Sequence, residues 1–123
     1  MGKIRLMVVD DSPFIHKAVK RALPTDDYEI VGCAENGKDG CEKYKELRPD
    51  VVLMDITMPV MDGLDAAQAI LSDDSSAKIV MLSAMGDDEL MERAKGIGVK
   101  DFMQKPFDQD LIKEVLSRVA GGA

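Results

Sequence analysis

Cysteine, histidine and tryptophan are scarce in this chain. Its 123 residues include two cysteines, one histidine and no tryptophan. Two cysteines and one widely separated histidine do not form a zinc-binding pattern. A domain of this size needs no disulfide for its stability, so we expect Cys33 and Cys41 to be reduced thiols. Cys33 lies in the apolar stretch from Glu29 to Ala34, which favours its burial.

Long apolar runs and excess positive charge are also absent. The longest apolar runs extend over about six residues before a charge interrupts them, which is too short to cross a bilayer. The first residues lack the basic start and apolar core of a secretion signal, so a cytoplasmic location is expected. The net charge is −7, from 16 basic and 23 acidic residues. This charge argues against nucleic-acid binding and suits a metal cation or a protein partner.

Apolar runs of strand length alternate five times with segments of helical spacing, in a chain long enough for one domain. The strands are expected at Ile4 to Val9, Tyr28 to Ala34, Val51 to Met54, Ile79 to Leu82 and Val99 to Met103. Helices are expected to start near Ser12, Asn36, Gly63, Gly86 and Asp108 and to end near Pro24, Arg48, Leu71, Gly96 and Val119. This alternation indicates parallel strands joined by crossover helices, and unbroken apolar runs indicate strands buried on both faces. The sequence therefore predicts a doubly wound α/β domain.

Local signals mark several helix ends. Ser12 is a residue type that can cap the first helix. Pro13 suits the first helical position, where its missing N–H is not needed. Asp108 can cap the fifth helix in the same way. Gly96 and Gly98 are typical of a helix C-terminus.

Polar side chains follow four of the predicted strands. They are Asp10 and Asp11 after the first, Asp55 after the third, Ser83 after the fourth and Lys105 after the fifth. In open α/β sheets, ligands bind outside the carboxyl ends of the strands, where the strand order reverses. We therefore expect the three carboxylates to converge in an acidic pocket. Their mutual repulsion would raise their pKa values unless a cation were bound.

The residue types in this pocket favour phosphoryl chemistry. Mg²⁺ is commonly held by few carboxylates and keeps waters that a phosphate can displace, whereas Ca²⁺ normally takes more protein oxygens. Ser83 and Lys105 can bind phosphate oxygens. A carboxylate between a metal ion and a lysine can attack phosphorus and form an acyl phosphate, so Asp55 is the candidate nucleophile.

Each residue taken alone has a simpler interpretation. Asp10 and Asp11 could be turn and cap residues, Ser83 a turn residue and Lys105 a solvated lysine. Their joint occurrence at four strand ends favours a functional site. His16 has no acidic or nucleophilic partner in the sequence pattern and is expected on the surface.

The motifs Asp10-Asp11, Asp55-x-x-Met58-Pro59-x-Met61-Asp62-Gly63, Ser83-Ala84 and Lys105-Pro106-Phe107 closely resemble those of response-regulator receiver domains. The resemblance covers about residues 3–119 and implies a single receiver domain over residues 1–123. It also implies a flavodoxin-like (βα)5 fold, with a parallel sheet of order 2-1-3-4-5 and helices on both faces. Within the family, Ser83-Ala84-Met85-Gly86 and Lys100-Asp101-Phe102 are most similar to the stand-alone chemotaxis regulators.

The resemblance also implies roles for individual residues. Asp55 would accept phosphate from the phosphohistidine of a sensor histidine kinase. Mg²⁺, with Mn²⁺ as an alternative ion, would be bound by Asp11, Asp55 and the backbone carbonyl of Thr57, and largely through water by Asp10. Lys105 would hold a phosphoryl oxygen, and its peptide bond to the following proline would be cis.

A conformational switch is implied as well. Ser83 would move toward the phosphate, and Phe102 would then turn inward and remodel the surface of the fourth helix, fifth strand and fifth helix. Serine replaces the more frequent threonine and keeps its hydroxyl, whereas phenylalanine replaces the frequent tyrosine and lacks the phenolic hydroxyl. Thr57 and Met85 are expected to tune hydrolysis of the phosphate.

The function implied is that of a phosphoacceptor switch, not an enzyme, in a two-component pathway that is plausibly chemotaxis. The expected partners are a sensor kinase, a downstream protein such as a flagellar motor switch component, and a phosphatase; no nucleic acid or membrane partner and a monomeric state are expected. Three alternatives stay open. The chain could be a receiver excised from a longer regulator or a phosphorelay intermediate, or a flavodoxin-like binding module that is not phosphorylated. The third alternative is a Mg²⁺-dependent phosphohydrolase, which would need an acid/base residue two positions after its nucleophile; this chain has Thr57 at that position.

Overall fold

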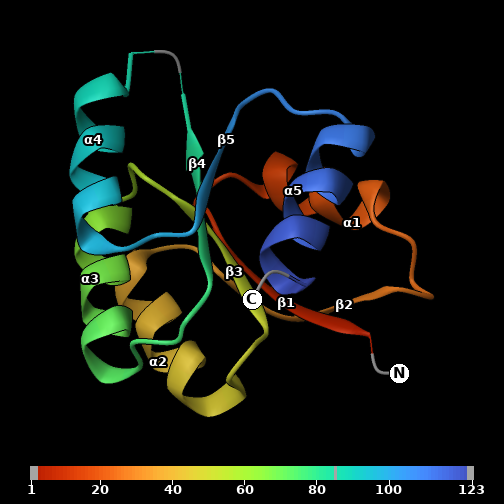
Figure 1. The fold of residues 1–123 in the computed structure, drawn as a ribbon, viewed down its shortest axis with the longest axis horizontal. Helices are drawn as coiled ribbons and strands as arrows, with labels where there is room; N and C mark the ends of the chain where they lie inside the picture. Colours follow the sequence, from red (N-terminus) through yellow and green to blue (C-terminus); the bar gives the residue numbers. More distant parts are fainter. Residues whose placement is uncertain (1–2, 85, 122–123) are drawn as a thin grey trace.

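The computed structural model describes residues 3–84 and 86–121, which form a five-stranded parallel sheet with helices on both faces (Figure 1). The strands are β1 (Ile4–Val9), β2 (Tyr28–Ala34), β3 (Val51–Asp55), β4 (Ile79–Ser83) and β5 (Asp101–Gln104). The helices are α1 (Pro13–Ala22), α2 (Gly37–Leu47), α3 (Gly63–Asp73), α4 (Asp88–Ile97) and α5 (Gln109–Gly121). The strand order β2-β1-β3-β4-β5 confirms the predicted topology.

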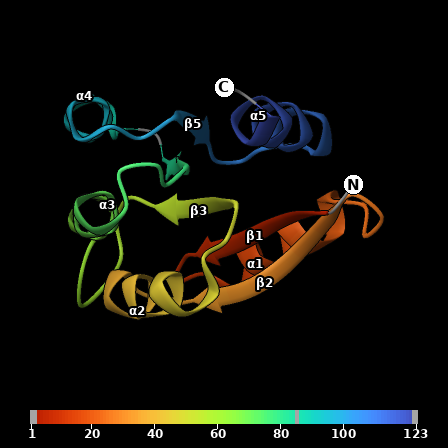
Figure 2. The same cartoon turned by 60° about the horizontal axis from the view of Figure 1, so that its bottom comes forward.

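The sheet separates two apolar layers. Helices α2, α3 and α4 cover one face, and α1 and α5 cover the other (Figures 1 and 2). Successive side chains of a strand point to opposite faces, so Met7 and Val9 pack in the first layer and Leu6 and Val8 in the second. β3 and β4 are buried at every residue, which explains their continuous apolar sequences. None of the helices in the described ranges has the length and apolar character needed to cross a bilayer.

The edge strand β2 departs from the expected burial. Both cysteines are free thiols, as predicted, but the expected burial of Cys33 is wrong because its side chain is exposed. β2 pairs only with β1 in the sheet, and the register between them shifts after Leu6. The sequence of β2 has the apolar character of a central strand, but its position at the edge leaves Cys33 uncovered.

The helix ends agree with the sequence signals in most cases. The side chain of Asn36 accepts a hydrogen bond at the start of α2 (2.9 Å), and that of Asp108 accepts one from Leu111 N (2.8 Å). Gly98 ends α4 with φ = 112°. The cap expected from Ser12 is wrong, since its side chain makes no cap hydrogen bond. The predicted limits of β5 and α3 differ from the observed ones by one or two residues.

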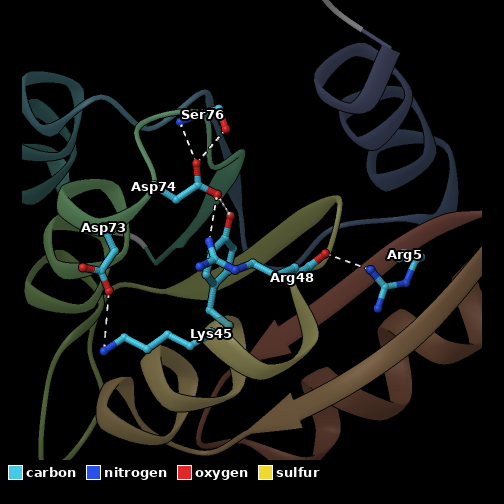
Figure 3. Close-up of polar contacts among 7 residues, drawn as sticks. Arg5, Lys45, Arg48, Asp73, Asp74 and Ser76 are labelled. Carbon is cyan, nitrogen blue, oxygen red and sulfur yellow. Dashed lines mark hydrogen bonds and ion pairs between the residues drawn. The ribbon is translucent and has the colours of Figure 1, made fainter.

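A polar network joins helix C-termini at the end of the sheet where the strands begin (Figure 3). The guanidinium of Arg5 donates to the carbonyls of Leu47 and Arg48, each at 2.8 Å, where α2 ends. Arg48 Nη1 lies 3.3 Å from Asp74 Oδ2, and the Tyr44 hydroxyl donates to the same oxygen at 2.8 Å. Burial, with the hydrogen bond to Asp74 and its charge, raises the pKa of Tyr44 to about 12. The network fixes α2 against the end of α3.

Candidate functional site

Three carboxylates converge at the carboxyl ends of β1 and β3, as the sequence predicted. These strands are neighbours, with Val9 opposite Met54, so Asp10 and Asp55 follow at the same edge of the sheet. Asp10 is fully buried, Asp55 is 8% exposed and Asp11 is exposed. One carboxylate oxygen from each lies within 4.8 Å of the others.

Lys105 lies against two of these carboxylates. Its Nζ is 2.7 Å from Asp10 Oδ2 and 3.3 Å from Asp55 Oδ1. The backbone N–H of Lys105 donates to the carbonyl of Ser83 at 2.8 Å, which ties the segment after β5 to the end of β4. The bond from Lys105 to Pro106 is cis, as the family resemblance implied. The contact with Asp10 was not anticipated, because only a position across the pocket could be read from the sequence.

The electrostatics follow from burial and charge. Burial, together with the charge of Asp10, raises the pKa of Asp55 to about 6 against the opposing effect of Lys105. Burial alone would lower the pKa of Lys105, but its contacts with Asp10 and Asp55 outweigh burial and raise this pKa. Asp55 is therefore an ionised but destabilised carboxylate at neutral pH.

The donor set suits a hard divalent cation. Asp10 Oδ1 accepts a hydrogen bond from Ser12 N at 2.8 Å. Among the described residues, none donates a well-oriented hydrogen bond to the buried Asp10 Oδ2, so its contact with Lys105 is an ion pair without hydrogen-bond geometry. Buried carboxylate oxygens that lack donors and lie close together are ligands that Mg²⁺ accepts. The residues present therefore fit a metal ion.

His16 contacts the acidic cluster from α1, contrary to the expectation of a surface side chain. It is half-buried, and its Nε2 lies 2.7 Å from the carbonyl oxygen of Asp10. A carbonyl can only accept, so Nε2 carries the hydrogen. The sequence signal for this contact is the position of His16 within the first turns of the helix that follows Asp10. The sequence pattern offers His16 no side-chain partner, and the observed partner is a backbone carbonyl.

Ser83 and Phe102, the two expected switch residues, line one cavity. Ser83 is the last residue of β4 and is 1% exposed, whereas Phe102 in β5 is half-buried. The cavity has a volume of about 350 Å³ and is also bordered by Met91 of α4. Thr57 is exposed in the segment after β3. Met85 lies outside the described residues.

The turn from Asp55 to Gly63 brings its two ends close together. A Cβ at Gly63 would lie 2.0 Å from the carbonyl oxygen of Asp55, so only glycine permits this approach. Asp62 caps α3 by accepting a hydrogen bond from Asp65 N at 2.9 Å. Val60 has φ = 69°, a left-handed conformation that is rare for a β-branched residue. The turn thus joins the end of β3 directly to the start of α3.

The family model of the response regulator receiver domain matches residues 6–117, nearly the whole chain. The chain belongs to the response-regulator receiver family. It is thus a receiver domain of two-component signal transduction.

The similar proteins are consistent with this assignment. The receiver is 45% identical to the chemotaxis protein CheY of Thermotoga maritima, over 98% of this chain and 99% of that protein. It is 44% identical to CheY of Bacillus subtilis, over 93% and 95% of the two chains. The receiver domain of the putative response regulator NarL from Mycobacterium tuberculosis superposes with a TM-score of 0.92 at 31% identity, covering both chains fully. CheY in the CheX-CheY-BeF3-Mg complex from Borrelia burgdorferi matches at 32% identity and a TM-score of 0.85, over 93% and 87%.

Proposed function

We propose that Asp55 is the phosphoacceptor of a CheY-like chemotaxis regulator and takes its phosphoryl group from the phosphohistidine of a sensor kinase. The observation that carries this proposal is the placement of Lys105 Nζ 3.3 Å from Asp55 Oδ1 and 2.7 Å from Asp10 Oδ2, within the carboxylate cluster that Asp11 completes. An ionised Asp55 there has both a cation and two candidate metal ligands beside it. The chemotaxis assignment is supported by the similarity to CheY proteins over nearly the full chain.

In the proposed reaction, a carboxylate oxygen of Asp55 attacks phosphorus as the bond from phosphorus to the imidazole nitrogen of the donor breaks. The leaving imidazole keeps the electron pair. Lys105 neutralises one phosphoryl oxygen as a point charge, and the Ser83 hydroxyl donates to another. Hydrolysis later returns Asp55 to a carboxylate and releases phosphate, so the domain acts as a switch with its own turnover and not as an enzyme on an external substrate.

Mg²⁺, or Mn²⁺ in its place, is proposed to bind Asp10, Asp11, Asp55 and the backbone carbonyl of Thr57. When bound, it supplies positive charge that neutralises the transferring phosphoryl oxygens and the crowded carboxylates. The buried Asp10 Oδ2 supports this ligand set, because among the described residues it has an ion pair with Lys105 but no hydrogen-bond donor. Thr57 is also proposed to tune hydrolysis, because its exposed side chain follows the phosphoacceptor by two residues.

The proposed output is a change in the surface formed by α4, β5 and α5. Ser83 and Phe102 border the same cavity of about 350 Å³. Attraction of Ser83 to the phosphoryl group would free space on the Phe102 side, and the ring would turn inward. Phosphorylation then shifts the population between two packings of this surface.

The proposed partners follow from this function. They are a sensor kinase, a downstream protein such as a flagellar motor switch component, and a phosphatase. The solved CheY from Borrelia burgdorferi is in complex with CheX, which supports a further protein partner for this chain. We propose one receiver domain over residues 1–123 that acts as a cytoplasmic monomer, because its kinase and effector are expected in that compartment.

The test is intact-mass spectrometry after incubation with acetyl phosphate and Mg²⁺. Wild-type protein is expected to gain one phosphoryl group, and Asp55→Asn none. Asp62→Asn is the matched control, because asparagine keeps the helix cap and the same charge is removed from the same turn. Equal gains in wild type and Asp55→Asn would refute the assignment.

A further inference from the structure

A groove lies between α1 and the edge strand β2, away from the proposed output surface. Its volume is about 480 Å³. Leu23, Tyr28 and Ile30 provide apolar walls, and Lys3, Lys17 and Lys20 lie along its border. β2 and β5 are the opposite edges of the sheet, so this groove lies at the edge remote from β5 and α4 (Figure 2).

The charge of the groove differs from that of the whole protein. The lining has three ammonium groups and one carboxylate, that of Glu29, in a chain of net charge −7. Among the described residues, no carboxylate oxygen lies within 4.0 Å of the ammonium group of Lys3, Lys17 or Lys20. The groove therefore concentrates positive charge that the fold does not neutralise.

The walls of the groove are apolar and are fixed by the core. Leu23 and Tyr28 are 6% and 7% exposed, and the Tyr28 hydroxyl lies 3.1 Å from Ser117 Oγ of α5. Cys33, exposed against expectation, adds to the same lining. The Lys43 ammonium donates to the carbonyl of Cys33, so this part of the β2 edge is already occupied and cannot pair with an added strand. Recognition here must come from side chains.

We propose that this groove binds an acidic segment of a partner protein, whose carboxylates meet Lys3, Lys17 and Lys20 while apolar side chains enter between α1 and β2. The volume suits a few side chains. Charge complementarity selects acidic residues, and the apolar walls require apolar ones beside them. Nucleic acid or an anionic bilayer would be repelled by the remainder of the chain, and neither fills a recessed apolar groove. This surface is independent of Asp55 and leaves the output surface free for another partner.

The binding test uses fluorescence anisotropy of a labelled decapeptide that alternates glutamate and leucine. Wild-type protein is expected to bind it more tightly than peptides that alternate lysine with leucine or glutamate with serine. Lys17→Glu/Lys20→Glu should weaken binding about tenfold or more, through two lost attractions and two new repulsions. Lys38→Glu/Lys100→Glu makes the same change in net charge at exposed positions outside the groove and should alter affinity by about twofold at most.

A footprint on the unaltered protein locates the peptide. Alkylation by N-ethylmaleimide, followed by peptide mapping, should slow at Cys33 and stay unchanged at Cys41 when the glutamate-leucine peptide is present. Asp55→Asn should give the same protection, which separates this inference from the phosphoacceptor assignment. Equal affinity for either control peptide, tighter binding of oligo-dT or phosphatidylglycerol vesicles, or an unprotected Cys33 would overturn the proposal.

Discussion

Replacing Asp55 by asparagine is expected to stabilise the metal-free protein at neutral pH. The side chain keeps its shape and loses a charge that burial and Asp10 disfavour. A pKa moved from 3.8 to about 6 corresponds to roughly 3 kcal/mol of unfavourable ionisation. The raised pKa already includes the attraction to Lys105, and screening by water at the mouth of the site reduces the expected gain to about 1–2 kcal/mol.

The stability difference between wild type and Asp55→Asn should depend on pH. The pKa of Asp55 is raised in the folded protein, so its contribution to stability is complete below the unfolded value of 3.8 and is lost as the pH rises through about 6. The advantage of the asparagine variant should therefore be full above pH 6 and small near pH 4. Urea unfolding in EDTA at pH 7.5 and pH 4 measures both.

Two outcomes would refute this reasoning. One is an Asp55→Asn variant that is less stable than wild type at pH 7.5, and the other is an advantage that persists unchanged at pH 4. Asp26→Asn removes an exposed carboxylate outside the cluster and should change stability little at either pH. Added Mg²⁺ should stabilise wild type more than Asp55→Asn, because a ligand of the folded state stabilises it by mass action.

Four further substitutions test the local geometry. Val60→Gly should raise the free energy of unfolding by about 1 kcal/mol, because φ = 69° strains valine and its side chain, 79% exposed, has little packing to lose. A lower urea midpoint in the variant would contradict the strain. Gly63→Ala should lower the free energy of unfolding by about 2 kcal/mol or more, because the new Cβ would meet the last carbonyl of β3. Gly96→Ala, at a position of α4 where a Cβ meets no other atom, should raise it by about 0.5–1 kcal/mol. Equal effects of the two substitutions would refute the close approach at Gly63. Tyr44→Phe should remove an absorbance transition near pH 12 and cost about 1 kcal/mol, and a Tyr44 phenol that ionises near pH 10 would contradict the combined effect of burial and the hydrogen bond to Asp74.

Much of the fold and site could be predicted because the signals are local. Val51 to Met54 and Ile79 to Leu82 have continuous apolar sequences, and a strand buried on both faces requires this. The convergence of Asp10 and Asp55 followed from a topological rule, since parallel neighbouring strands end at one edge. The strand order itself came from the family resemblance.

The features that escaped prediction depend on contacts between distant segments. Cys33 has the apolar neighbours of a buried residue, and only the sheet order reveals that its strand is an edge. The contact of His16 with the carbonyl of Asp10 depends on how α1 leaves β1. The positive φ of Val60 has no local signature, because neither Pro59 nor Met61 requires it.

The position of the phosphoryl group is the measurement that tests the central claim most directly. Protein phosphorylated by a phosphohistidine donor can be reduced with borohydride, which converts an aspartyl phosphate into homoserine, and the modified residue can then be identified by peptide mapping. The account predicts homoserine at position 55 alone, its loss when Mg²⁺ is chelated, and its absence in Asp55→Asn. Modification of Asp10, Asp11 or any residue other than Asp55 would contradict the account.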